Sequence, residues 1–207
     1  MIESYLRQSA LDHLALAGRT SEAPQSVGVR LGEKLLPAAV NLRGDAADPA
    51  FVAAVREALG VEPPTAPNTA ASSGELVLLW LGPDEWLAVR HDATPEGEAL
   101  LAAKLREALG DLHAAVAEVG EQYACIHLAG PKAREAIEKG CPLDLHPRAF
   151  GGVDHCAQSH LSKASIILHQ VDEGPGFDLY TRRSFADYLW RWLEDASQEY
   201  GMTIVAP

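Results

Sequence analysis

The first half of the chain alternates apolar runs of strand length with two stretches of helical spacing. Asp48-Pro49 and Thr94-Pro95 each predict a helix start, because Asp or Thr caps the first turn and Pro suits the first helical position. Strands are predicted at 27–31, 38–42, 75–81, 86–90 and 113–119. This order, with a hairpin turn between the third and fourth strands, predicts a split βαβ, or ferredoxin-like, lobe.

The second half repeats this pattern less regularly. Gly130-Pro131 predicts one helix start, and Ser184 is predicted to cap the strongest helix of the chain. The apolar stripe of that helix is predicted to comprise Phe185, Leu189, Trp192, Leu193 and Ala196. Strands are predicted at 122–128, 163–169, 177–181 and 203–205. We therefore expect an α+β protein with two tandem split-βαβ (ferredoxin-like) lobes, at 25–119 and 120–207, after an N-terminal arm at 1–24.

Three features are candidates for contacts with a partner chain. A short helix from Ser9 to Gly18, with Ser9 as its cap, has no obvious packing surface, and the loop 140–152 carries apolar side chains. Trp190 lies about 100° from the apolar stripe of its helix. We expect both segments at subunit interfaces, with packing on their own lobe as the alternative. For Trp190, a wide core face and a partner contact are equally good interpretations.

Composition and charge narrow the class of protein. The formal net charge is −12 and 47% of residues are hydrophobic, so the chain can bury a core but shows no basic patch for a nucleic acid. We find no apolar run of membrane-spanning length and no basic-then-apolar leader. Three cysteines are an odd number for a disulfide framework. A cytoplasmic protein without nucleic-acid or membrane partners is therefore expected.

Candidate chemistry is sparse. Cysteines and histidines gather in one region that invites a metal interpretation: Cys141, His146, His155, Cys156 and His160. Only Cys156 and His160 approach the spacing of zinc ligands, so a buried thiol beside solvent-facing histidines is the better interpretation. Nucleophile-elbow, dinucleotide-binding and P-loop patterns are also missing from the sequence. We therefore expect no catalytic, cofactor-binding or metal-binding residues in this chain.

Several segments together resemble a known family. They are Gly82–Leu87, Leu128–Arg134, the run Cys141-Pro142-Leu143-Asp144-Leu145-His146-Pro147, and Phe177–Trp190. These segments resemble the gamma subunits of heterotetrameric sarcosine oxidases, and the resemblance extends over nearly the whole chain. The cysteine-to-proline run is the most specific of them.

The resemblance implies a non-catalytic accessory subunit with alpha, beta and delta partners. It implies that the complex oxidatively demethylates sarcosine to glycine, hydrogen peroxide and a formaldehyde equivalent, which is captured as 5,10-methylenetetrahydrofolate. It further implies that the complex uses FAD, FMN, NAD, tetrahydrofolate and zinc through its other subunits.

A more distant resemblance is to part of the folate-binding aminomethyltransferase fold of the glycine cleavage T-protein. It rests on Gly130–Ile137 and on Gly176–Tyr180. Asp178 falls where those relatives place a folate-contacting Glu, and its shorter side chain weakens the case for pterin binding. The alternative function is therefore a free-standing folate-binding protein of the aminomethyltransferase type.

Overall fold

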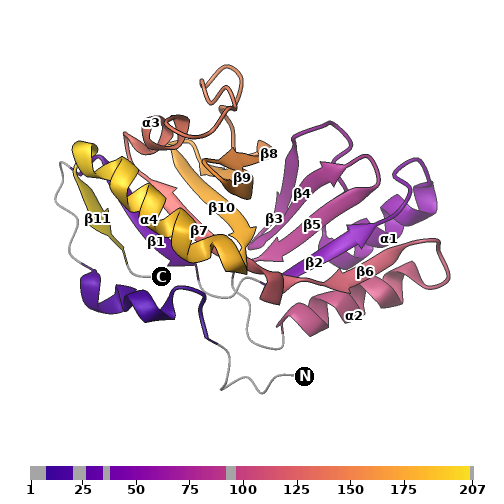
Figure 1. Cartoon of the computed structure of the whole chain (residues 1–207). Coiled ribbons are helices and arrows are strands. Elements are labelled where there is room, and N and C mark those ends of the chain that lie inside the picture. The colour runs from indigo at the N-terminus through magenta and orange to yellow at the C-terminus, as the bar shows by residue number, and fades with distance from the viewer. Residues whose placement is uncertain (1–7, 21–26, 35–37, 92–96, 206–207) are drawn as a thin grey trace. The chain divides into compact units, whose positions relative to one another are not determined.

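The computed structural model describes residues 8–20, 27–34, 38–91 and 97–205. These residues form two compact units, each built on one β-sheet with helices (Figure 1). The five-stranded unit comprises 38–91, 97–121 and 154–157 of the described residues, and the six-stranded unit comprises the rest. The predicted α+β class with two sheets is confirmed. The expected helix start at Thr94-Pro95 lies outside the described residues.

The five-stranded sheet has the connectivity of a split βαβ unit. Its strands, in spatial order, are β3 (Ala70–Ser73), β4 (Leu76–Gly82), β5 (Glu85–Arg90), β2 (Ala38–Arg43) and β6 (Ala115–Glu118). Helix α1 (Pro49–Leu59) follows β2, and helix α2 (Gly97–Leu109) follows β5. Strand β5 lies between β2 and β4 and is antiparallel to both, so β2 before α1 and β4 after it are parallel and separated by a third strand.

The core of this unit lies between one face of the sheet and the two helices. Phe51 of α1 and Trp86 of β5 are almost completely buried, with ring centroids 5.7 Å apart. The Trp86 indole donates a hydrogen bond to the carbonyl of Pro64 at 2.8 Å. Asp48 caps α1 as predicted, since its carboxylate accepts from the Ala50 amide at 2.9 Å.

Strand β6 forms the outer edge of the five-stranded sheet, and an arginine covers part of it. Arg106 of α2 donates to the carbonyl oxygen of Val116 at 3.0 Å and to the Glu118 carboxylate at 3.1 Å. An unpaired strand edge is a template for pairing with another chain, and a charged side chain on the edge opposes this. We therefore infer that Arg106 opposes self-association through this edge.

We expect Arg106→Ala to increase self-association with rising protein concentration, because it uncovers the Val116 carbonyl and leaves Glu118 unpaired. Light scattering coupled to size exclusion measures this directly. Arg56→Ala is the matched control, since Arg56 pairs with Glu62 on the surface and binds no strand in the described residues. Equal behaviour of the two variants would contradict the edge-protection role.

The six-stranded sheet contains a second split unit with one additional central strand. The spatial order is β11 (Met202–Ile204), β1 (Val29–Lys34), β7 (Tyr123–Ala129), β10 (Gly176–Arg182), β9 (Ala164–Asp172) and β8 (Cys156–Leu161). Strand β10 lies between β7 and β9 and is antiparallel to both. Helices α3 (Ala133–Glu138) and α4 (Ala186–Ser197) belong to the same unit.

Strand β1 does not lie where the sequence pattern placed it. It was expected in the first lobe, whereas it pairs antiparallel with β7 and parallel with β11 in the six-stranded sheet. Val29 and Leu31 are completely buried there, and Glu33 on the same face is also buried. A short apolar run shows that a segment is a strand but contains no information about its partner. The expected membership of 27–31 in the first lobe is therefore corrected.

The N-terminal arm forms two 3-10 turns, at Asp12–Leu14 and Leu16–Arg19, in place of the expected helix. Ala15 between them has φ 47° and ψ 48°, a left-handed conformation that interrupts a right-handed helix. The Ser9 hydroxyl accepts from the Leu11 amide at 2.9 Å and also binds Glu33. Leu11 is completely buried and Arg19 pairs with Glu194 of α4, so the arm packs on its own unit.

Helix α4 turns a different face toward the core from the one predicted. Its buried residues are Ala186, Leu189, Trp190, Leu193, Ala196 and Ser197. Phe185 lies in a preceding 3-10 turn and is 41% exposed, whereas Trp190 is completely buried. The predicted and observed stripes share three residues and differ by a shift of one position, which helical spacing alone does not distinguish. The core interpretation of Trp190 is therefore correct, and Ser184 does not cap the helix.

The loop 140–152 also packs on its own unit. Leu145 and Phe150 are buried, and Arg134 of α3 donates to the carbonyl oxygens of both residues. The Arg134 guanidinium also lies 5.0 Å from the centre of the Phe177 ring.

No helix in the described residues is long and apolar enough to cross a membrane.

Candidate functional site

A polar group of side chains lies across four strands of the six-stranded sheet. Asp178 on β10 pairs in register with His127 on β7 and with His169 on β9. Residues directly opposite one another on antiparallel strands point to the same face. Lys34 on β1 pairs with Cys125, two positions before His127, so its side chain projects from this face too. The register thus gathers a carboxylate, two imidazoles, an ammonium and a thiol.

Both oxygens of the Asp178 carboxylate are bound within the chain. Lys34 Nζ donates to Oδ2 at 2.6 Å, and His127 Nδ1 donates to Oδ1 at 2.7 Å. The Asp178 side chain is completely buried, whereas 32% of the Lys34 side chain and 23% of the His127 side chain are exposed. A buried carboxylate is tolerated only when it is paired and hydrogen-bonded. We call these three residues the Asp178 cluster.

The cluster keeps Asp178 ionised. Burial by itself raises the pKa of this carboxyl group, but the hydrogen bond from His127 and the charge and hydrogen bond of Lys34 outweigh it. The net effect is a pKa below the usual value of an aspartate. Burial, and after it the negative charge of Asp178, raise the pKa of the Cys125 thiol well above its usual range. Cys125 is therefore a protonated thiol at neutral pH and a poor nucleophile.

Most of the cysteines and histidines considered as metal ligands in the sequence contact other groups instead of one another. Cys141 lies 3.8 Å from the Ser159 hydroxyl, and Cys156 donates to the carbonyl of Thr69 at 3.2 Å. Burial raises the pKa of Cys156 to about 11. His146 accepts from the Arg148 amide, and His155 contacts Asp154. Among the residues that the structure describes, no group of three or more His, Cys, Asp or Glu could hold a metal ion.

Sequence reasoning singled out Asp178 but not its two partners. Lys34 and His127 lie 144 and 51 positions away in the chain, so no local spacing connects them with Asp178. A signal was nevertheless present. His127 is a polar residue inside the apolar strand run Ala124-Cys125-Ile126-His127-Leu128, where period-two alternation places it on the face of Cys125.

Comparison with known proteins shows the family of this chain. A family model described as "Sarcosine oxidase, gamma subunit family" matches residues 43–199. The chain belongs to the sarcosine oxidase gamma subunit family. It is 36% identical over 208 aligned residues to sarcosine oxidase subunit gamma of Corynebacterium sp. (strain P-1), covering all of this chain and 98% of that protein.

Solved structures give the same family and the wider fold. A chain of heterotetrameric sarcosine oxidase from Corynebacterium sp. U-96, in complex with pyrrole 2-carboxylate, is 32% identical to this gamma-family chain, with a TM-score of 0.83. The match covers 97% of this chain and 100% of that chain. Aminomethyltransferase T of Bartonella henselae is 13% identical, with a TM-score of 0.68 over 97% of this chain and 59% of that one. The second match shows the fold, as the distant resemblance implied.

Proposed function

We propose that this chain is the accessory gamma subunit of a heterotetrameric sarcosine oxidase, supporting assembly with alpha, beta and delta subunits while supplying no catalytic residue. The full-length similarity carries the proposal, since 36% identity extends over all of this chain and 98% of a gamma subunit. The proposal places the complex in the cytoplasm. There it converts sarcosine to glycine, hydrogen peroxide and a formaldehyde equivalent captured as 5,10-methylenetetrahydrofolate. FAD, FMN, NAD, tetrahydrofolate and zinc are assigned to the other subunits.

The Asp178 cluster supports a structural role for this carboxylate. A folate-contacting carboxylate has to present an oxygen to the pterin, whereas both Asp178 oxygens accept hydrogen bonds from Lys34 and His127. The carboxylate is also completely buried. A pterin could reach this completely buried carboxylate only if Lys34 or His127 moved aside, which would break a charge-assisted hydrogen bond worth about 1.5–3 kcal/mol. The residues present therefore do not fit a folate contact through Asp178.

The proposal predicts that the purified chain alone neither oxidises sarcosine nor shows flavin absorbance. It also predicts that a tagged chain, coexpressed with the other three subunits, recovers them together with sarcosine oxidase activity. Activity assays, absorbance spectra and mass identification of the recovered chains measure these outcomes. If the coexpressed chains elute separately on size exclusion, the proposal fails.

The alternative is a free-standing folate-binding protein of the aminomethyltransferase type, favoured by the shared fold and by the segments Gly130–Ile137 and Gly176–Tyr180. Isothermal titration of the chain with tetrahydrofolate separates the two. Micromolar binding that disappears on Asp178→Ala would support the alternative, whereas the Asp178 cluster predicts no such binding.

A further inference from the structure

Once the arm and the loop 140–152 are packed on their own unit, few large apolar side chains stay exposed. In the described residues, two of the four such side chains are Phe185, 41% exposed, and Tyr188, 36% exposed, and they lie about one turn apart at the start of α4. Trp192 lies a further turn along the helix and is partly exposed. We call Phe185, Tyr188 and Trp192 the aromatic stripe.

The aromatic stripe is held in place by its own unit. The Tyr188 hydroxyl hydrogen-bonds the Ser162 hydroxyl at 2.7 Å, in the turn between β8 and β9. Trp192 lies against Gly140 so closely that a Cβ at that glycine would be 2.5 Å from the indole ring. The Ser162 amide in turn donates to the Gly140 carbonyl at 2.9 Å. Fixed aromatic side chains lose little conformational entropy when a partner covers them.

Two other sides of α4 are already covered within its own unit. Its inner face, which includes Trp190, is buried in its own unit. On the flank opposite the stripe, the arm pairs His13 with Asp187 at 2.7 Å and Arg19 with Glu194. The aromatic stripe is therefore the apolar side of α4 that stays open in the described part of the chain, next to the exposed polar residues Arg191 and Asp195.

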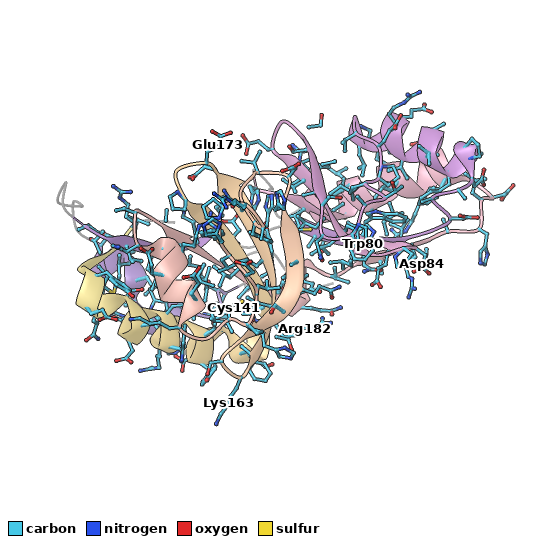
Figure 2. All side chains as sticks on the ribbon, turned by 90° about the horizontal axis from the view of Figure 1, so that it is seen from above. Trp80, Asp84, Cys141, Lys163, Glu173 and Arg182 are labelled. Carbon is cyan, nitrogen blue, oxygen red and sulfur yellow. The ribbon has the colours of Figure 1, made fainter. Side chains whose placement is uncertain are left out.

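Charge distinguishes between possible occupants of the stripe. Lys163 follows Ser162 in the same turn, and its side chain extends away from the ribbon (Figure 2). Lys163 makes no ion pair with any residue that the structure describes. A second copy of this chain carries the same net charge of −12 and would be repelled at long range. A different chain, with apolar side chains facing the stripe and a carboxylate facing Lys163, fits better.

We propose that the aromatic stripe, together with Lys163, is the surface through which this chain docks on another subunit of the sarcosine oxidase complex. Apolar side chains of that subunit cover Phe185 and Trp192, and a carboxylate pairs with Lys163. The inference rests on the proposed function and names the surface that function requires.

The test uses the full tagged chain coexpressed with the other three subunits. Phe185→Asp places a charge in the stripe, and Lys163→Glu reverses the charge at its end without altering any apolar contact. Leu100→Asp is the matched control, because Leu100 is 67% exposed on α2 in the five-stranded unit. We expect at least about tenfold lower recovery of partner subunits for Phe185→Asp, a smaller loss for Lys163→Glu, and no loss for Leu100→Asp. Each variant should melt at the wild-type temperature.

The outcomes separate the inference from the proposed function. If the wild-type chain recovers no partner subunits, the proposed function fails. If the wild type, Phe185→Asp and Lys163→Glu all recover the partner subunits equally well, the proposed function stands and the docking surface is wrong. A wild-type chain that dimerises alone, with Phe185→Asp restoring the monomer, would assign the stripe to a second copy and overturn the inference. If Phe185→Asp melts early, Lys163→Glu decides alone.

Discussion

Replacing Lys34 by Met should lower the free energy of unfolding by about 3 kcal/mol at neutral pH, since it leaves the buried Asp178 carboxylate with His127 alone. This loss is at the low end of the range for a broken buried ion pair. The reason is that 32% of the Lys34 side chain is exposed, so water can partly replace the missing ammonium group. Urea unfolding followed by circular dichroism measures the difference. Lys132→Met, in a surface pair with Glu135, is the matched control and should leave stability nearly unchanged.

The same variant tests the charge on Asp178. Because the folded pKa of Asp178 lies below its unfolded value of about 3.9, the ion pair stabilises the fold above that pH, and this stabilisation is lost as the pH falls through the folded pKa. The difference between wild type and Lys34→Met should therefore be large at pH 7 and shrink below about pH 4. A difference that is the same at both pH values would show that the ion pair contributes nothing.

Trp190→Ala should destabilise the chain by about 4 kcal/mol, because it removes a completely buried indole from α4. Trp192→Ala, two residues along the same helix, is the matched control, and we expect less than half of that loss because Trp192 is partly exposed. Urea titrations of both variants provide the comparison. A larger loss for Trp192 than for Trp190 would show that the helix turns the other face to the core.

The elements of the five-stranded unit were largely predictable from the sequence. Strands β4 and β5 and the capped start of α1 follow from local apolar runs, from turn residues and from Asp48. Two edge strands were missed. Ala70–Ser73 and Cys156–Leu161 lack a clear apolar alternation, and pairing with a neighbour, not intrinsic preference, makes them strands.

What the sequence could not predict is non-local. The Asp178 cluster forms only when three strands pair in the correct register. The rotation of α4 about its axis depends on which of its side chains fit against the rest of the core. The small residues Ala186 and Ser197 share the buried face of α4 with Trp190, although neither gives a strong apolar signal in the sequence. The family, in contrast, was identifiable from the sequence, because its motifs consist of consecutive residues and do not depend on how the chain folds.

The central position of β1 has a consequence for the order in which the chain folds during its synthesis. Residues 38–121 contain all the named strands of the five-stranded sheet, so this sheet can form once β6 has left the ribosome, before the segment 154–157 joins the unit. Strand β1 emerges earlier, but its neighbours are β7, which begins at Tyr123, and β11, which ends at Ile204. Strand β1 therefore lacks both of its neighbours until β7 and β11 have been synthesised, so the six-stranded sheet closes later than the five-stranded one.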